Sequence, residues 1–153
     1  VFRVQVPTGS GAVADAPPGV DAPATALTGR RILVVDDEAT VRDGMCDLLV
    51  AWGCRAEAFA GPAEVPPDAL PPDAVVVDYR LAGSVDGLAA IAELRARFGR
   101  DLPAILISGE SSSAHLARID ASGIPLLHKP VPPAKLRAVL QYMLGRGDSE
   151  AAA

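Results

Sequence analysis

The sequence predicts an α/β protein with a doubly wound, five-stranded parallel sheet that is covered by helices on both faces. From Arg30 onward, short apolar segments alternate with segments whose apolar residues recur at helical spacing. Two of the short segments, "AVVV" and "AILI", are apolar throughout, which is typical of parallel strands buried on both faces. The helices between successive strands would be the right-handed crossovers that join parallel neighbours.

Five short segments are predicted as the strands of this sheet. They are Ile32–Val35, Cys54–Ala58, Ala74–Val77, Ala104–Ile107 and Pro125–Leu127. Ligands of open parallel sheets gather beyond the carboxyl ends of the strands. The residues that follow each segment are therefore the first candidates for a functional site.

Apolar residues at helical spacing predict three strong helices and a weaker one. The strong helices are marked by Val41–Trp52, Leu88–Phe98 and Leu136–Leu144. Gly53 can close the first of them. The weaker helix is expected to run from Ser111, a capping residue, to about Ser122, with Gly123 as its stop.

The segment "GPAEVPPDALPPD" lies where a further helix should follow the second strand. It contains Pro66, Pro67, Pro71 and Pro72. Each proline removes a backbone N–H donor and clashes with the preceding turn of a helix. A turn or two is the most that this composition permits, so we expect the second helix to be shortened.

The chain of 153 residues is long enough for one domain with a real core and some additional segments. Residues 30–146 carry the alternating pattern and are predicted as that domain. Residues 7–29 are rich in Pro, Gly and Ala and predict a flexible linker. Residues 1–6, "VFRVQV", alternate as one strand would, and residues 147–153 are expected to form a disordered tail.

The composition limits the class of partner. The formal net charge is −5 and the isoelectric point is near 4.9, which argues against a nucleic-acid or anionic membrane surface. No apolar run approaches the roughly 20 residues that span a bilayer. We therefore expect no nucleic-acid partner and no direct membrane contact by this segment. A cytoplasmic location is a separate expectation. Cys46 and Cys54 lack the spacing of metal ligands and are interpreted as buried or idle thiols.

Five polar residues stand at the ends of the predicted strands. Asp36 and Asp37 follow the first strand, Asp78 the third, Ser108 the fourth and Lys129 the fifth. Each residue alone could be a helix cap, a turn residue or a solvated side chain. Their shared position at one rim of the sheet favours a functional site.

The side chains at this rim restrict the chemistry. Carboxylates bind a hard cation through oxygen, and Mg²⁺ prefers one or two of them together with waters and a phosphoryl oxygen. A carboxylate can also act as a nucleophile and form an aspartyl phosphate. A lysine ammonium and a serine hydroxyl can both bind phosphoryl oxygens. The pattern therefore indicates a site for a divalent cation and a phosphoryl group.

The segments "ILVVDDE", "VVVDYRL", "ILISGE" and "LLHKPVPP" resemble the receiver domain of two-component response regulators, over about residues 30–146. The resemblance implies a flavodoxin-like receiver fold with strand order 2-1-3-4-5. It also implies that Asp78 is the phosphoacceptor and that a histidine kinase or a histidine phosphotransfer domain is the partner. Such a domain catalyses its own phosphorylation from a phosphohistidine, and its own dephosphorylation.

The same resemblance implies a Mg²⁺ cofactor and its ligands. Asp37, Asp78 and the backbone carbonyl of Arg80 would ligate the ion directly. Asp36 would act through a metal-bound water. These assignments account for two adjacent carboxylates directly after an apolar strand, because a cation would offset their repulsion and lost hydration.

The resemblance also assigns the residues that handle the phosphoryl group. Lys129 would pair with the incoming group, and Ser108 would bind one of its oxygens and respond to it. The peptide bond between Lys129 and Pro130 is expected to be cis. Receivers commonly place Tyr or Phe three residues before the lysine, where this chain has Leu126. Signalling would therefore rest on Ser108 and the loop after it, without an aromatic switch at that position.

Arg80 and Glu110 stand two residues after Asp78 and Ser108 respectively. In the family these positions flank the entrance of the site and tune the lifetime of the phosphoryl group. Opposite charges there could pair across the entrance and hinder the attacking water. The alternative is two solvated side chains that contribute under about 1 kcal/mol to each other.

The receiver-like segment could belong to more than one kind of protein. Residues 1–6 and the linker resemble the end of a histidine kinase ATP-binding domain, which would make this the C-terminal receiver of a hybrid sensor histidine kinase. The alternatives are a freestanding response regulator and an unphosphorylated docking module of the same fold.

A haloacid dehalogenase-type phosphatase would want D-x-D after the first strand, where this chain has "DDE". A dinucleotide-binding domain would want a Gly-rich turn there, and this chain has no glycine between the first strand and Gly44.

Overall fold

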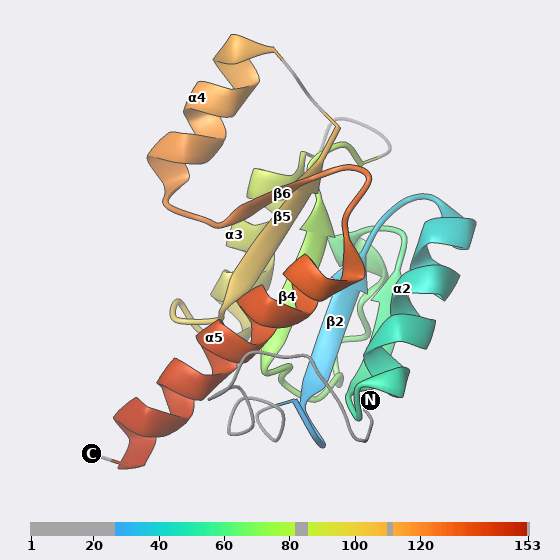
Figure 1. Ribbon diagram of the computed structural model, residues 1–153. Coiled ribbons are helices and arrows are strands. Elements are labelled where there is room, and N and C mark those ends of the chain that lie inside the picture. The colour runs from blue at the N-terminus through green and yellow to red at the C-terminus, as the bar shows by residue number, and fades with distance from the viewer. Residues whose placement is uncertain (1–26, 82–85, 110–111, 153) are drawn as a thin grey trace, which may run out of the picture.

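The computed structural model describes residues 27–81, 86–109 and 112–152 (Figure 1). The strand predicted at residues 1–6 and nearly all of the predicted linker therefore lie outside the described residues. Within the part that is described, no helix combines the length and the apolar character needed to cross a membrane.

The sheet has five parallel strands in the order β3-β2-β4-β5-β6, as predicted. Their bounds are Arg31–Val35 (β2), Arg55–Phe59 (β3), Ala74–Asp78 (β4), Ala104–Ser108 (β5) and Leu126–His128 (β6). The register pairs Val35 with Val77, and Asp78 with Ile107 on the next strand. The carboxyl ends of the central strands therefore meet at one edge of the sheet.

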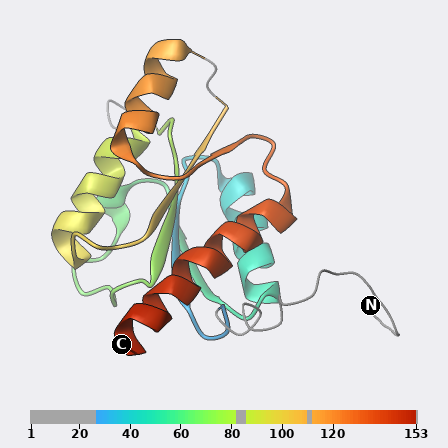
Figure 2. The ribbon, with the colours of Figure 1, turned by 60° about the vertical axis from the view of Figure 1, so that its left-hand side comes forward.

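Among the described residues, four α-helices pack around the sheet on both of its faces, as expected for a doubly wound fold. They are α2 (Ala39–Ala51), α3 (Gly87–Phe98), α4 (Ser113–Ser122) and α5 (Pro133–Ala152). On one face, Ile32 and Val34 pack in a core with residues of α2 and α5. On the other face, Leu33 and Val35 pack in a second core with residues of α3 and with Ile119 of α4. Figure 2 shows α3 on the opposite side of the sheet from α2 and α5.

The second helix is shortened, as its prolines predict. A single 3₁₀ turn, η1 (Pro62–Glu64), stands in its place. Arg97 of α3 donates hydrogen bonds to the carbonyl oxygens of Val65 (3.1 Å) and Pro66 (2.6 Å). These carbonyls follow η1, so a side chain from α3 satisfies groups that a longer helix would have bonded within itself.

Residues just before the expected boundary at Arg30 also pack against the core. Leu27 is fully buried in the core shared by α2 and α5. The amide of Gly29 donates to the carbonyl of Gly53 (2.8 Å), just beyond the end of α2. At the other end of the chain, α5 continues to Ala152, past the boundary expected at residue 146.

Helix α4 has the slight core contact that its composition predicts, with Ile119 as its buried residue. Gly123 ends the helix in the left-handed conformation (φ 73°), which glycine adopts without a steric penalty. The N-cap residue is Ser112, whose side chain makes no capping hydrogen bond. Ser111, which we expected as the cap, lies outside the described residues. In Figures 1 and 2, α4 stands at the margin of the molecule, beyond the edge where β5 ends.

Candidate functional site

Three carboxylates converge at the carboxyl edge of the sheet. Asp36 follows β2, Asp37 comes next, and Asp78 is the last residue of β4. Asp36 and Asp78 are 4% and 6% exposed, whereas Asp37 is exposed to solvent. One carboxylate oxygen from each residue lies within 4.8 Å of the other two. The spacing suits shared coordination of one cation by oxygen ligands.

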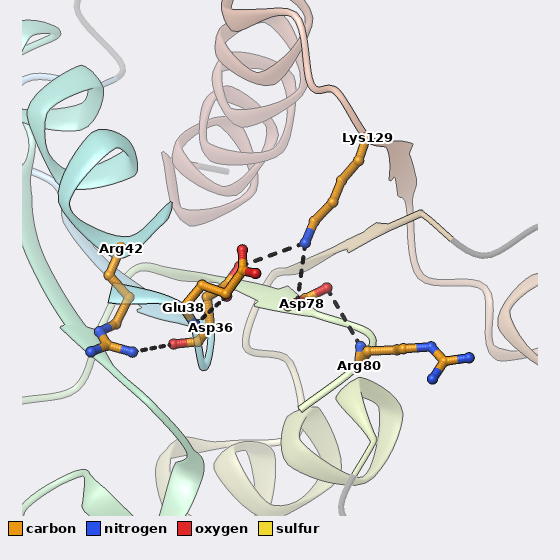
Figure 3. A network of polar contacts seen from close by, with 6 residues as sticks. All are labelled: Asp36, Glu38, Arg42, Asp78, Arg80 and Lys129. Carbon is orange, nitrogen blue, oxygen red and sulfur yellow. Dashed lines mark hydrogen bonds and ion pairs between the residues drawn. The ribbon is translucent and has the colours of Figure 1, made fainter. Parts of the chain in front are cut away.

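Lys129 reaches this cluster from the segment after β6 (Figure 3). Its Nζ lies 3.3 Å from Oδ2 of Asp78 and 4.0 Å from Oδ2 of Asp36. The amide of Lys129 donates to the carbonyl of Ser108 (2.9 Å), which aligns the lysine with the end of β5. The ammonium group is thus held directly over the two buried carboxylates.

Burial and mutual repulsion make the charged forms of these carboxylates costly. The pKa of Asp78 is raised above its ordinary value, chiefly because burial removes hydration from the charged form, while Lys129 opposes the rise. The pKa of Asp36 is raised for the same reason, with the charge of Asp78 adding to the rise. One ammonium therefore does not neutralise the set, and a divalent cation would supply the missing positive charge.

Two backbone amides bond the carboxylates of Asp36 and Asp78, and one arginine bonds the backbone of Asp36. The amide of Glu38 donates to Oδ1 of Asp36 (2.9 Å), and the amide of Arg80 donates to Oδ1 of Asp78 (3.4 Å). Arg42 Nη1 donates to the backbone carbonyl of Asp36 (2.7 Å), as Figure 3 shows. The role of Arg42 was not predicted from the sequence. Arg42 lies one helical turn after Glu38, in the first turn of the helix that follows the acidic pair. This position could have indicated that its side chain reaches back to the pair.

The remaining predicted residues fall around this cluster. Ser108 ends β5 and is 1% exposed, beside the strand that carries Asp78. The peptide bond between Lys129 and Pro130 is cis, as predicted. Leu126 begins β6 and packs half-buried against the second core. Glu110 lies outside the described residues, so its pairing with Arg80 stays a prediction.

A groove of about 580 Å³ adjoins the lysine. Its walls come from α2 and from the segment after β6, and they are mainly apolar. The lining residues are Glu38, Val41, Gly44, Met45, Leu48, Ile107, Lys129, Pro130 and Val131. A mainly apolar groove therefore borders the acidic site.

Comparison with known proteins identifies the family. The sequence model of the response regulator receiver domain matches residues 32–141, which hold every described residue of the site. The chain belongs to the response regulator receiver family. Receiver domains bind Mg²⁺ at an acidic site and accept phosphoryl groups from histidine kinases. This membership excludes the phosphatase and dinucleotide-binding alternatives.

Curated relatives of this receiver domain are response regulators. The response regulators MprA of Mycobacterium bovis (BCG / Pasteur) and of Mycobacterium tuberculosis (H37Rv) are each 34% identical to it over 128 residues. Each match covers 80% of this chain and 54% of the relative. The chain therefore spans about half the length of the curated relatives it matches.

Solved structures agree on the fold of this receiver domain. A CheY-like receiver domain from Methanospirillum hungatei superposes with a TM-score of 0.71 at 21% identity, covering 80% of this chain and 99% of the other. The receiver domain of the sensor histidine kinase PA1611 from Pseudomonas aeruginosa superposes with a TM-score of 0.67 at 27% identity, covering 77% and 99%. That second structure is described with a magnesium ion coordinated in its active-site cleft.

Proposed function

We propose that this receiver domain takes a phosphoryl group from a phosphohistidine onto Asp78. The observation that carries the proposal is the buried Asp78 carboxylate with the Lys129 ammonium 3.3 Å away, beside two further carboxylates. In this reaction an oxygen of Asp78 attacks the phosphorus. The P–N bond breaks, and its electron pair leaves with the imidazole nitrogen.

The donor set fits Mg²⁺, because all three side chains offer carboxylate oxygens and carry more negative charge than one lysine can balance. Asp37, Asp78 and the backbone carbonyl of Arg80 would hold the ion, with Asp36 acting through a water. The ion would supply positive charge to the phosphoryl oxygens during transfer. Lys129, which follows β6 at the same edge of the sheet, would bind one of these oxygens.

Ser108 would bind another oxygen of the phosphoryl group once it is attached. The side chain lies at the end of β5, the strand next to Asp78, and the chain leads from it to α4 within a few residues. A shift of Ser108 toward the phosphoryl group would therefore be passed to α4. This connection supports a switch in the surface formed by α4, β6 and α5.

The groove between α2 and the segment after β6 supports a phosphohistidine protein as the donor. It borders Lys129 and is lined mainly by apolar side chains of α2, of β5 and of the segment after β6. An apolar helix face from a histidine kinase or a histidine phosphotransfer domain fits such a groove. A donor seated there would present its phosphoryl group to the acidic cluster from the open side.

We also propose that the chain is the C-terminal receiver of a hybrid sensor histidine kinase. The alternating pattern of residues 1–6 and the linker support this, and the PA1611 relative is itself a receiver domain of a sensor histidine kinase. A freestanding response regulator is the alternative, supported by the names of the MprA relatives. Sequencing the encoding gene upstream of residue 1 distinguishes them: a kinase ATP-binding domain there supports the first proposal.

Incubation with acetyl phosphate and Mg²⁺, followed by intact-mass measurement, tests the phosphoacceptor. We expect one phosphoryl adduct on the wild type and none on Asp78→Asn or Asp37→Ala. An adduct that survives Asp78→Asn would refute the assignment of the phosphoacceptor. Failure of the wild type to accept a phosphoryl group from acetyl phosphate and from a phosphohistidine protein would favour the unphosphorylated docking module.

A further inference from the structure

Tyr79 connects the residue next to the phosphoacceptor with helix α4. It directly follows Asp78 and is 3% exposed. Its ring lies against His115 of α4, with the ring centroids 5.4 Å apart and the planes tilted by 53°. Arg118 of α4, one turn further on, donates from Nη1 to the hydroxyl oxygen of Tyr79 (3.3 Å).

Arg118 also joins α4 to the start of α3. Its Nη2 lies 3.2 Å from Oδ2 of Asp86. The other oxygen of Asp86 accepts from the amide of Ala89 (2.8 Å) and so caps α3. The backbone of Asp86 forms a bridge with that of Arg80, two residues after the phosphoacceptor. The guanidinium of Arg118 therefore contacts Tyr79, directly after β4, and Asp86, directly before α3.

These contacts are a large part of what fixes α4. The helix has Ile119 as its buried residue, and a groove of about 700 Å³ separates much of it from β6. Leu116, Ile124 and Leu126 line this groove. Little apolar packing opposes movement of α4 over this space, so the polar contacts of Arg118 have a large share in setting its position.

We infer that Arg118, through Tyr79 and Asp86, is a latch that holds α4 in the position it takes while Asp78 is unmodified. The inference rests on the proposed function of Asp78. When Ser108 moves toward a phosphoryl oxygen, the short connection to Ser113 pulls on α4. Tyr79 and Asp86 belong to the β4–α3 connection and stay in place, so the contacts of Arg118 lengthen and break.

The latch has a consequence for affinity, because contacts made in one state only bias the equilibrium between the two states. Breaking the latch costs free energy each time the site is occupied. Removing Arg118 should therefore strengthen binding of a phosphoryl analogue. Simple electrostatics predicts the opposite sign, since loss of a positive charge weakens binding of an anion. The direction of the change thus separates the latch from a charge effect.

Titration with beryllofluoride in excess Mg²⁺ tests the latch, read from the backbone amide signals of Leu116 and Ala117 in α4 by NMR. We expect Arg118→Gln to bind beryllofluoride about two- to fivefold more tightly than the wild type. Tyr79→Phe keeps the ring and loses the hydroxyl, so it should change affinity in the same direction and by less. Arg100→Gln removes the same charge from an exposed position before β5, at the far end of the sheet, and should match the wild type.

The side chain of Arg118 is 57% exposed, so its replacement should leave the fold intact, and thermal unfolding checks this. Equal affinities for Arg118→Gln and Arg100→Gln, or weaker binding by Arg118→Gln, would overturn the latch while leaving Asp78 as the phosphoacceptor. If the wild type itself fails to bind beryllofluoride, the proposed function falls and the latch with it. The two failures are therefore distinguishable.

Discussion

At the scale of the residue, Asp78 combines reactivity with a cost in stability. The folded chain buries its carboxylate beside Asp36, and Lys129 compensates only in part. The pKa of Asp78 lies above its ordinary value of 3.8 because of that burial. The folded protein therefore binds this proton more tightly than the unfolded chain, and its stability falls as pH rises through the raised pKa.

Asp78→Asn should accordingly stabilise the metal-free protein at pH 7, by an amount on the order of 1 kcal/mol. The amide has nearly the same shape and removes one buried negative charge. Thermal unfolding in EDTA measures the difference. The gain should shrink as the pH is lowered through the raised pKa, because the wild-type carboxyl is then protonated as well. A variant that is less stable than the wild type at pH 7 would contradict this account of Asp78.

At the scale of the element, Gly87 allows α3 to start directly against the strand of the phosphoacceptor. A Cβ added to it would lie 2.6 Å from the carbonyl oxygen of Asp78 and 2.7 Å from both Tyr79 Cα and Leu106 Cδ2. Two of these three neighbours are backbone atoms, which cannot move aside without shifting β4. Glycine is therefore required here for close approach.

Gly87→Ala should destabilise the domain by about 3 kcal/mol, because the added methyl group has no room. Gly44→Ala is the matched control, since Gly44 also lies within a helix and nothing stands within 4 Å of its added Cβ. That substitution should instead stabilise by about 0.5–1 kcal/mol. Urea unfolding of both variants gives the comparison. Similar midpoints for the two would show that the contact at Gly87 relaxes easily.

Arg97 stabilises the segment that replaces the shortened second helix. It bonds the carbonyls of Val65 and Pro66 from α3. Arg97→Met keeps most of the apolar stem and removes both hydrogen bonds, so we expect a loss of about 1 kcal/mol in the free energy of unfolding. Arg100→Met, an exposed neighbour, should cost less than about 0.5 kcal/mol. Equal urea midpoints for the two variants would remove this role from Arg97.

The strands and helices were predictable from the sequence, whereas the side-chain hydrogen bonds between them were not. Apolar runs, helical spacing and the prolines after Gly61 each act locally, so strands, helices and the shortened second helix follow from neighbouring residues. Arg97 and Val65 are 32 residues apart. Every residue has a backbone carbonyl, so the sequence near Val65 does not show that its carbonyl accepts a hydrogen bond from Arg97. This contact could therefore not be predicted from the sequence.

At the scale of the whole molecule, the topology explains why the candidate site was predictable. Asp78 and Ser108 are the last residues of their strands, and Asp36 and Lys129 come directly after theirs. Parallel strands bring these ends to one edge of the sheet. The latch was not predictable in this way. Arg118 reaches Tyr79 and Asp86 from the side of a helix, and its direction depends on how α4 sits against the sheet.

The burial of Leu27 was also not predicted, for a different physical reason. Leu27 follows a long stretch of Pro, Gly and Ala, and a single leucine gives no periodic pattern. In the fold it is nonetheless 0% exposed and packs in the core with Ile32 and Cys54. The amides of Gly29 and Arg30 then bond the carbonyls of Gly53 and Leu27. The residues just before β2 are thus packed against the core and hydrogen-bonded to it.

Leu27→Ala should therefore destabilise the domain by about 2–4 kcal/mol, since it removes a fully buried side chain and leaves a cavity. Leu70→Ala is the matched control, because Leu70 is 61% exposed and its truncation should cost less than about 0.5 kcal/mol. Urea unfolding of both variants measures the difference. A chain that starts at Arg30 should also be less stable than one that starts at Leu27, by a similar amount. If the two leucine variants unfold at the same urea concentration, Leu27 contributes nothing to the core and the domain begins at β2.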